Sequence, residues 1–165
     1  MKALWTPWRM EYVAGQAGKE PGCLFERGAG KKYDRSHLLL YRDPLTTVFL
    51  NRFPYANGHL LLAPARHVAE MANLTDEEML GLMRLIKDSV VILRRHLAPD
   101  GFNIGLNLGK IAGAGLEDHL HYHIVPRWQG DHNFIAVLGE LKTIPEHFLA
   151  TFDRLLPSFQ DLAAP

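Results

Sequence analysis

The sequence predicts an α+β domain with a mainly antiparallel sheet, one long helix and a C-terminal helix. Short apolar segments bounded by turn-forming residues predict hairpin strands before residue 65, and again at 102–108 and 119–125. Between these groups, residues 75–96 carry apolar side chains at helical spacing. Hairpin strands on both sides of one long helix are typical of the α+β class.

One domain is expected over residues 1–165, because a chain of this length with 47% hydrophobic residues can bury a sizeable core. Residues 1–36 are predicted to be an irregular arm, interrupted by glycines and docked through large aromatic side chains. Residues 37–126 are assigned to the core sheet and helix, ending in the strand at 119–125. Residues 127–165 are assigned to a C-terminal extension.

The first strands are predicted from short apolar segments and turn signals. Residues 38–41 and 47–51 are expected to form two strands separated by the turn signal Asp43-Pro44. Residues 58–63 are expected to form a third strand, which ends before Pro64.

The long helix is predicted to begin at a capping box, in which Thr75 and Glu78 satisfy each other's backbone N–H groups. It extends to about His96, and its predicted apolar face comprises Met79, Leu82, Met83, Ile86, Val90 and Leu93. A closing helix is predicted over 144–156, with Pro145 in the first turn, where its missing N–H breaks no helical hydrogen bond.

Residues 119–125, His-Leu-His-Tyr-His-Ile-Val, place three of the nine histidines at alternate positions. In a strand, His119, His121 and His123 would share one face, and the apolar residues between them would pack on a core from the other. The histidine face is then expected to look outward or into a cleft. Imidazoles about 6.5 to 7 Å apart can line a groove for phosphates or supply metal ligands.

Charge and cysteine content limit the expected binding partners and cellular compartment of the protein. Eighteen basic and eighteen acidic residues cancel, which argues against a general nucleic-acid or membrane-surface binder. The single cysteine, Cys23, excludes an internal disulfide and suits a reducing compartment. The N-terminal segment has no apolar run of the length of a signal peptide or membrane span, so a cytoplasmic location is expected.

The segment 119–125 resembles the histidine triad (HIT) motif, His-φ-His-φ-His-φ-φ with φ hydrophobic, at every position. Other segments follow in the order that the family shows, among them Asn51, residues 57–67 and residues 103–107. Residues 4–10 and 126–134 further resemble the branch that includes diadenosine-tetraphosphate phosphorylases and other dinucleoside polyphosphate enzymes.

This resemblance implies a HIT-like fold and an enzyme that passes a nucleotidyl group through a covalent histidine. By position, His121 is the nucleophile, His123 and His59 hold phosphate oxygens and can shuttle a proton, and Asn51 binds the ribose hydroxyls. Imidazole suits this chemistry because it is a neutral nucleophile near pH 7 and a good leaving group once charged. The alternative for His59 is a partly buried histidine after a turn glycine.

The glycine-rich segment 107–115 precedes the triad. Its small residues let backbone amides approach phosphate closely, so Asn107, Lys110 and Gly115 are candidate phosphate contacts. Most glycine-rich turns have no role beyond the turn itself, and here the neighbouring triad is what favours phosphate binding. Many HIT hydrolases have Gly-Gln-Ser before the triad, whereas this chain has Ala-Gly-Leu at 114–116, which favours the phosphorylase-like branch.

Several HIT proteins begin with Cys-x-x-Cys, whose thiolates join two histidines around a structural zinc ion. The matching residues here are Cys23, Glu26, His67 and His119, and zinc also accepts a carboxylate oxygen. The alternative is that the site is lost and Cys23 is a small buried apolar residue. The resemblance implies no metal in the chemistry itself.

The leading interpretation is cleavage of dinucleoside polyphosphates, such as diadenosine tetraphosphate, with phosphate or water as the acceptor. Two alternatives remain open: a nucleotide-binding regulatory module with little turnover, and a metal-dependent phosphohydrolase in which His121 and His123 bind zinc. The expected ligands are adenine nucleotides or dinucleoside polyphosphates, and the resemblance also implies a homodimer.

Overall fold

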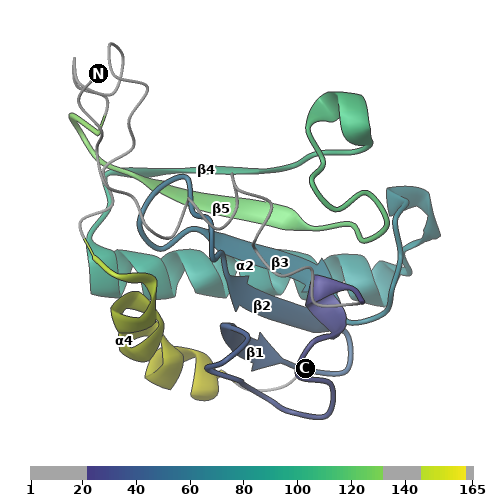
Figure 1. Ribbon diagram of the computed structural model, residues 1–165, viewed down its shortest axis with the longest axis horizontal. Helices are drawn as coiled ribbons and strands as arrows, with labels where there is room; N and C mark the ends of the chain where they lie inside the picture. The colour runs from purple at the N-terminus through teal and green to yellow at the C-terminus, as the bar shows by residue number, and fades with distance from the viewer. Residues whose placement is uncertain (1–21, 132–145, 163–165) are drawn as a thin grey trace.

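The computed structural model describes residues 22–131 and 146–162. In this part of the chain, five strands form one antiparallel sheet in the order β1-β2-β3-β5-β4 (Figure 1). The strands are β1 (Leu39–Arg42), β2 (Thr46–Leu50), β3 (Leu60–Pro64), β4 (Gly101–Leu106) and β5 (Tyr122–Arg127). The predicted α+β class with a mainly antiparallel sheet is therefore confirmed.

Strands β1 to β3 match the predicted segments closely, but β4 and β5 are shorter than predicted. Strand β4 ends at Leu106, and β5 begins at Tyr122, so His119 and His121 precede the strand. The physical reason is a competing backbone contact, because the Leu120 N–H donates to the carbonyl of Val68 at 2.7 Å and not to a sheet partner.

Helix α2 (Asp76–Leu97) begins at the predicted capping box. The Thr75 hydroxyl accepts from the Glu78 N–H at 3.2 Å, and the Glu78 carboxylate accepts from the Thr75 N–H at 2.9 Å. Its predicted apolar face is partly wrong, because Met79 and Met83 are 39% and 47% exposed. The buried stripe follows Leu82, Leu85, Ile86, Ser89, Ile92 and Leu93, which are turned toward the sheet.

Helix α4 (Phe148–Gln160) begins later than predicted; residues 144 and 145 lie outside the described residues. His147 caps it, because its Nδ1 atom accepts from the Leu149 N–H at 3.3 Å. Three short 3-10 helices complete the described elements: η1 (Leu24–Glu26), η2 (Met71–Asn73) and η3 (Lys110–Ala112). Neither described helix has the combination of length and apolar character needed to cross a lipid bilayer.

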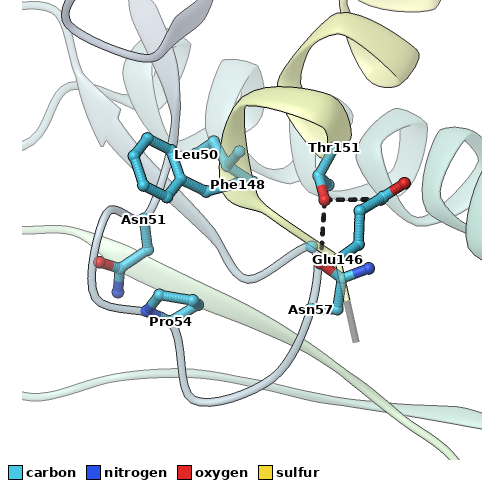
Figure 2. Close-up of a pocket in the computed structure, with 8 residues that line it drawn as sticks. Leu50, Asn51, Pro54, Asn57, Glu146, Phe148 and Thr151 are labelled. Carbon is cyan, nitrogen blue, oxygen red and sulfur yellow. Dashed lines mark hydrogen bonds between the residues drawn. The ribbon is translucent and has the colours of Figure 1, made fainter. Parts of the chain in front are cut away.

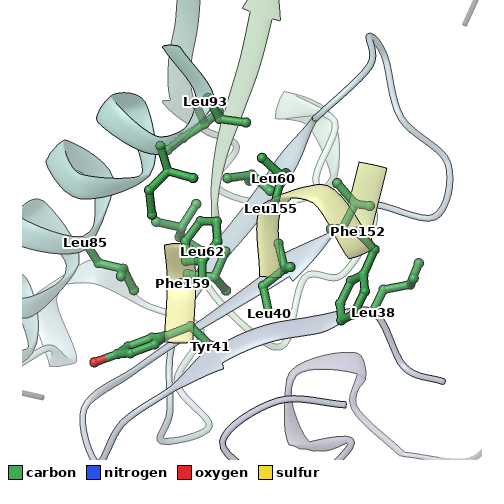
Figure 3. Close-up of a cluster of buried hydrophobic side chains, with 14 of the residues drawn as sticks. Leu38, Leu40, Tyr41, Leu60, Leu62, Leu85, Leu93, Phe152, Leu155 and Phe159 are labelled. Atoms are coloured by element: carbon green, nitrogen blue, oxygen red, sulfur yellow. The ribbon is translucent and has the colours of Figure 1, made fainter. Parts of the chain in front are cut away.

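Both helices pack on one face of the sheet and bury the main hydrophobic core (Figure 3). Side chains of α2 and α4 meet strand residues there, among them Leu40, Leu60, Leu62, Leu85, Leu93, Phe152, Leu155 and Phe159. A smaller cluster lies on the opposite face and comprises Phe25, Leu39, Phe49, Leu61 and Ala63. We call this opposite face the site face.

The predicted N-terminal arm is described only from residue 22 onward. Its aromatic residues Trp5, Trp8 and Tyr12 lie outside the described residues. In the described part, η1 places the fully buried Phe25 on the site face, edge-on to Phe49 with 5.7 Å between ring centroids.

Candidate functional site

Three predicted site histidines meet on the site face. His59 directly precedes β3, His121 directly precedes β5, and His123 lies in β5. His59 Nε2 lies 2.9 Å from His123 Nδ1, and the rings of His121 and His123 are 4.9 Å apart between centroids. His59 and His121 are buried. The tertiary structure therefore joins residues that are 64 positions apart in the sequence.

The hydrogen bonds of His59 determine where its proton lies. Its Nδ1 atom is 3.1 Å from the Tyr55 backbone N–H and 3.2 Å from the Asn51 amide nitrogen. Both neighbours are donors, because the Asn51 Oδ1 atom is occupied as the acceptor of the Phe53 N–H at 2.9 Å. His59 Nδ1 therefore has a lone pair, and the Nε2–H donates to His123.

His123 continues this chain of hydrogen bonds. Its Nδ1 atom accepts from His59, so a neutral His123 has its proton on Nε2. Burial, followed by repulsion from His121, lowers the pKa of His123 from its ordinary value to about 4. His123 is therefore neutral near pH 7 and presents an N–H donor on its outer nitrogen.

His121 has the opposite arrangement. Its Nδ1–H donates to the backbone carbonyl oxygen of His119 at 2.8 Å, which leaves the lone pair on Nε2. Burial lowers the pKa of His121, and the bond to the His119 carbonyl offsets part of this effect. The ring also packs against Phe25 at 5.1 Å between centroids. An oriented, neutral imidazole with a free Nε2 lone pair can act as a nucleophile.

The loop that joins β2 to β3, residues 51–59, holds Asn51 and His59 together. The Asn51 N–H donates to the His59 carbonyl at 2.9 Å. Gly58 has a φ of +75°, and a Cβ atom there would lie 2.3 Å from the Leu97 Cδ1 atom. Asn51 and His59, which were predicted as site residues with separate roles, are therefore in direct contact, and the loop that joins them needs a glycine where it meets the end of α2.

A second cluster contains three of the four predicted metal ligands. One ligand atom from each of Cys23, His67 and His119 lies within 4.8 Å of the others. The His119 Nε2–H donates to the Pro64 carbonyl at 2.9 Å, so its Nδ1 lone pair faces the Cys23 sulfur atom at 3.1 Å. Glu26 is not in this group, and its carboxylate lies 3.3 Å from His67 Nδ1.

The glycine-rich segment follows β4 in the chain, and its first residue lies next to the start of β5. In the β4–β5 ladder Gly105 pairs with His123 and Leu106 with Tyr122, so Asn107 follows next to the start of β5. The Asn107 amide donates to the Gly113 carbonyl at 3.3 Å, whereas Lys110, in η3, and Gly115 are exposed.

Two contacts of the site were not predicted from the sequence. The ring of Tyr55 stacks on His59 at 4.9 Å between centroids, and Phe25 packs against both His119 and His121. A tyrosine that follows a proline in a loop was the available signal for Tyr55, whose side chain is exposed.

Comparison with known proteins now places this geometry in a family. The HIT domain family model matches residues 34–130. A relative named AP-4-A phosphorylase from Mycobacterium tuberculosis (strain ATCC 25618 / H37Rv) is 40% identical over 153 residues, covering 88% of this chain and 78% of that protein.

Solved structures agree with this match. Plasmodium falciparum diadenosine triphosphate hydrolase in complex with Cyclomarin A has a TM-score of 0.56 and 25% identity, over 70% of this chain and 82% of that chain. A Zn-bound histidine triad family protein from Mycobacterium smegmatis has a TM-score of 0.60 and 26% identity, over 74% and 84%. With a family model that spans more than half of its residues, this chain belongs to the HIT domain family and is one of its nucleotide-binding hydrolase or transferase enzymes.

Proposed function

We propose that this enzyme cleaves dinucleoside polyphosphates, such as diadenosine tetraphosphate, through a covalent nucleotidyl intermediate on His121. The proposal rests above all on the orientation of His121. Its Nδ1–H is held by the His119 carbonyl, and burial keeps the ring neutral, so the Nε2 lone pair is available for attack.

The neighbouring residues suit the other roles of the reaction. His123 has its proton on Nε2 and can donate it to a phosphate oxygen, while His59 holds the His123 ring in this orientation. Asn51 uses one amide hydrogen and one lone pair of its oxygen within the loop. The second hydrogen and the second lone pair remain for a sugar diol.

The proposed first step forms a bond between His121 Nε2 and the α-phosphorus and breaks the bond to the bridging oxygen. With diadenosine tetraphosphate, AMP stays on His121 and ATP leaves. In the second step an oxygen of inorganic phosphate attacks the same phosphorus, which frees His121 and releases ADP. Water in place of phosphate gives AMP.

We favour phosphate as the acceptor. The M. tuberculosis relative is named a phosphorylase, and it matches most of this chain. The glycine-rich segment begins with Asn107 next to the start of β5, and its residues Lys110 and Gly115 are exposed, so a phosphate-sized ligand can reach them. Backbone amides and an ammonium group are common ligands of phosphate in proteins.

The experiment is intact-protein mass spectrometry after brief mixing with diadenosine tetraphosphate, followed by product analysis with and without inorganic phosphate. We expect an added adenylyl mass on the wild-type protein, ADP as a product when phosphate is present, and AMP when it is absent. AMP in both conditions would establish a hydrolase and refute the phosphorylase assignment.

The matched control is His121→Asn, which keeps a planar polar side chain but lacks the nucleophilic nitrogen. It should bind AMP, form no adduct and turn over no substrate. Turnover by this variant would refute the covalent mechanism. Loss of wild-type activity after brief treatment with a chelator would also refute it, because that loss is the result expected of a metal-dependent phosphohydrolase. Nucleotide binding by the wild type without an adduct or turnover would favour the regulatory module.

We also propose that Cys23, His67 and His119 hold a structural zinc ion. Sulfur and imidazole nitrogen are preferred zinc ligands, and the Pro64 carbonyl accepts the Nε2–H of His119 and so turns its Nδ1 lone pair toward the cluster. Glu26, in contact with His67, is the proposed fourth ligand. Without metal, burial raises the pKa of the Cys23 thiol, so zinc must stabilise the thiolate. A cysteine that is not part of a disulfide suits the cytoplasm.

Metal analysis of the purified protein tests this site. About one zinc per chain is expected in the wild type, and much less in Cys23→Ser, because serine is a poor zinc ligand. The Glu26→Gln variant should retain less zinc than the wild type. Equal zinc contents in the wild type and Cys23→Ser would refute the site.

We further propose that a second copy of the chain pairs with β4, which forms one edge of the described sheet. Ile104 of β4 is exposed, as are Met79 and Met83, which line a hollow of about 180 Å³ beside Tyr122. Exposed strand edges and apolar hollows favour association. Sedimentation should give a dimer for the wild type and for the control Ile111→Lys, but a monomer for Ile104→Lys. A dimeric Ile104→Lys protein would exclude this interface.

A further inference from the structure

A buried polar network joins α4 to the loop 51–59 (Figure 2). The Thr151 hydroxyl has one proton, which it can donate either to Asn57 Oδ1 at 2.9 Å or to Glu146 Oε2 at 2.8 Å. Thr151 is fully buried, and Asn57 is nearly so. The guanidinium of Arg154 pairs with the same Glu146 carboxylate. A buried amide that lost its partner here would face apolar side chains, which is costly.

The loop and α4 meet with almost no space between them. The cavity at their junction has a volume of about 10 Å³, room for one water at most, and is lined by Leu50, Asn51, Pro54, Asn57, Gly58, Glu146, Phe148 and Thr151. It is therefore too small to bind a nucleotide. The polar network is a structural connection between the helix and the loop.

Three consecutive residues of the loop each contact a different part of the protein. Asn57 bonds to Thr151 of α4, Gly58 packs on Leu97 at the end of α2, and His59 donates to His123 in the site. Because they are adjacent in the chain, a displacement of Asn57 moves the backbone of His59 directly. His59 Nδ1 is in turn the acceptor that holds the Asn51 amide.

We propose that Thr151 is a positioning residue for nucleotide binding, which acts through Asn57 on His59 and Asn51. The proposal rests on the proposed function, in which Asn51 and His59 contact the nucleotide. Helix α4 lies outside residues 34–130, which the HIT domain family model matches. This chain therefore uses its C-terminal helix to hold a nucleotide-binding loop of the family domain.

The test compares Thr151→Val with Thr151→Ser. Valine has the shape of threonine but no hydroxyl, whereas serine keeps the hydroxyl. The AMP dissociation constant, measured by calorimetry, should rise about tenfold in Thr151→Val, as expected for a lost buried hydrogen bond, and stay close to wild type in Thr151→Ser. In turnover assays KM should rise more than kcat falls, because His121 is not displaced.

The control is Ser158→Ala, which removes another hydroxyl of α4. The Ser158 hydroxyl lies 2.8 Å from His96 Nε2 of α2 and makes no bond to the loop. Its AMP affinity should match the wild type even if its stability falls. An equal loss of affinity in Ser158→Ala and Thr151→Val would mean general loosening of α4 and would overturn the proposal.

The Asn57→Ala variant removes the loop side of the same hydrogen bond and serves as the test if Thr151→Val does not fold. Where both fold, the double variant should lose little more AMP affinity than either single variant, because both changes break one connection. A folded Thr151→Val or Asn57→Ala protein with wild-type AMP affinity would refute the positioning role. Failure of the wild type to bind AMP would instead refute the proposed function.

Discussion

Substitution of Gly58 by alanine should destabilise the protein strongly. Gly58 has a φ of +75°, and a Cβ atom added there would lie 2.3 Å from Leu97 Cδ1 and 3.3 Å from Leu93 Cδ2. The left-handed conformation costs a residue with a Cβ atom about 1–2 kcal/mol. Displacement of leucine side chains in a packed core costs about 1–3 kcal/mol more. Gly58→Ala should therefore lower the free energy of unfolding by about 2–5 kcal/mol.

The assay is urea unfolding followed by circular dichroism, with Gly105→Ala as the matched control. A Cβ atom at Gly105 would meet nothing within 4 Å, and its φ lies outside the left-handed region. Gly105→Ala should change the unfolding free energy by less than about 0.5 kcal/mol, or stabilise the protein slightly. The reasoning is refuted if Gly58→Ala unfolds within about 0.5 kcal/mol of the wild type, or if the two variants behave alike.

Three further predictions concern the capping box, the site face and pH. Thr75→Ala should lower the free energy of unfolding, measured in urea, by about 1 kcal/mol, because the Glu78 N–H loses its acceptor. An unchanged free energy of unfolding would argue against a stabilising role of this cap. Phe25→Ala should cost about 3–5 kcal/mol because its fully buried ring packs on the site face, and a loss below about 1 kcal/mol would contradict this packing. The pKa of His123 is about 4 in the folded protein, below its ordinary value, so the unfolded chain binds this proton more tightly. The stability that the neutral ring contributes should be present above about pH 6.5 and be lost as pH falls toward 4. The urea concentration at the unfolding midpoint should therefore fall less between pH 6.5 and pH 4 in His123→Asn than in the wild type. An equal fall in the two proteins would exclude His123 as the cause.

Local patterns were enough to predict most of the secondary structure. Short β-branched and leucine-rich segments predicted β1 to β3, because a strand needs only a few apolar residues and two turn signals. Thr75 and Glu78 predicted the start of α2 to within a residue, because a capping box is a contact between near neighbours in the chain. The predicted first residue of β5 was wrong, because the hydrogen bond from Leu120 to Val68, more than 50 residues away, determines where the strand begins.

In the site, too, local features were predicted from the sequence and long-range contacts were not. The spacing of the triad predicted which histidines share a face, since alternation in an extended chain is a local property. It could not predict the position of each proton. Those positions depend on partners distant in sequence, such as His59 for His123, and on backbone atoms, such as the His119 carbonyl for His121. Burial, which makes these rings neutral, is also a property of the packed chain.

The sequence by itself determined the family motif, the helix start, the strand segments and the candidate ligands, because each depends on residues close together in the chain. Tertiary structure alone decided that His59 donates to His123, that Glu26 contacts His67 at the side of the three-residue cluster, and that the Thr151 hydroxyl of α4 meets Asn57. The last contact spans 94 positions. No periodicity records such a pairing, because it exists only once the sheet and both helices are packed around one core.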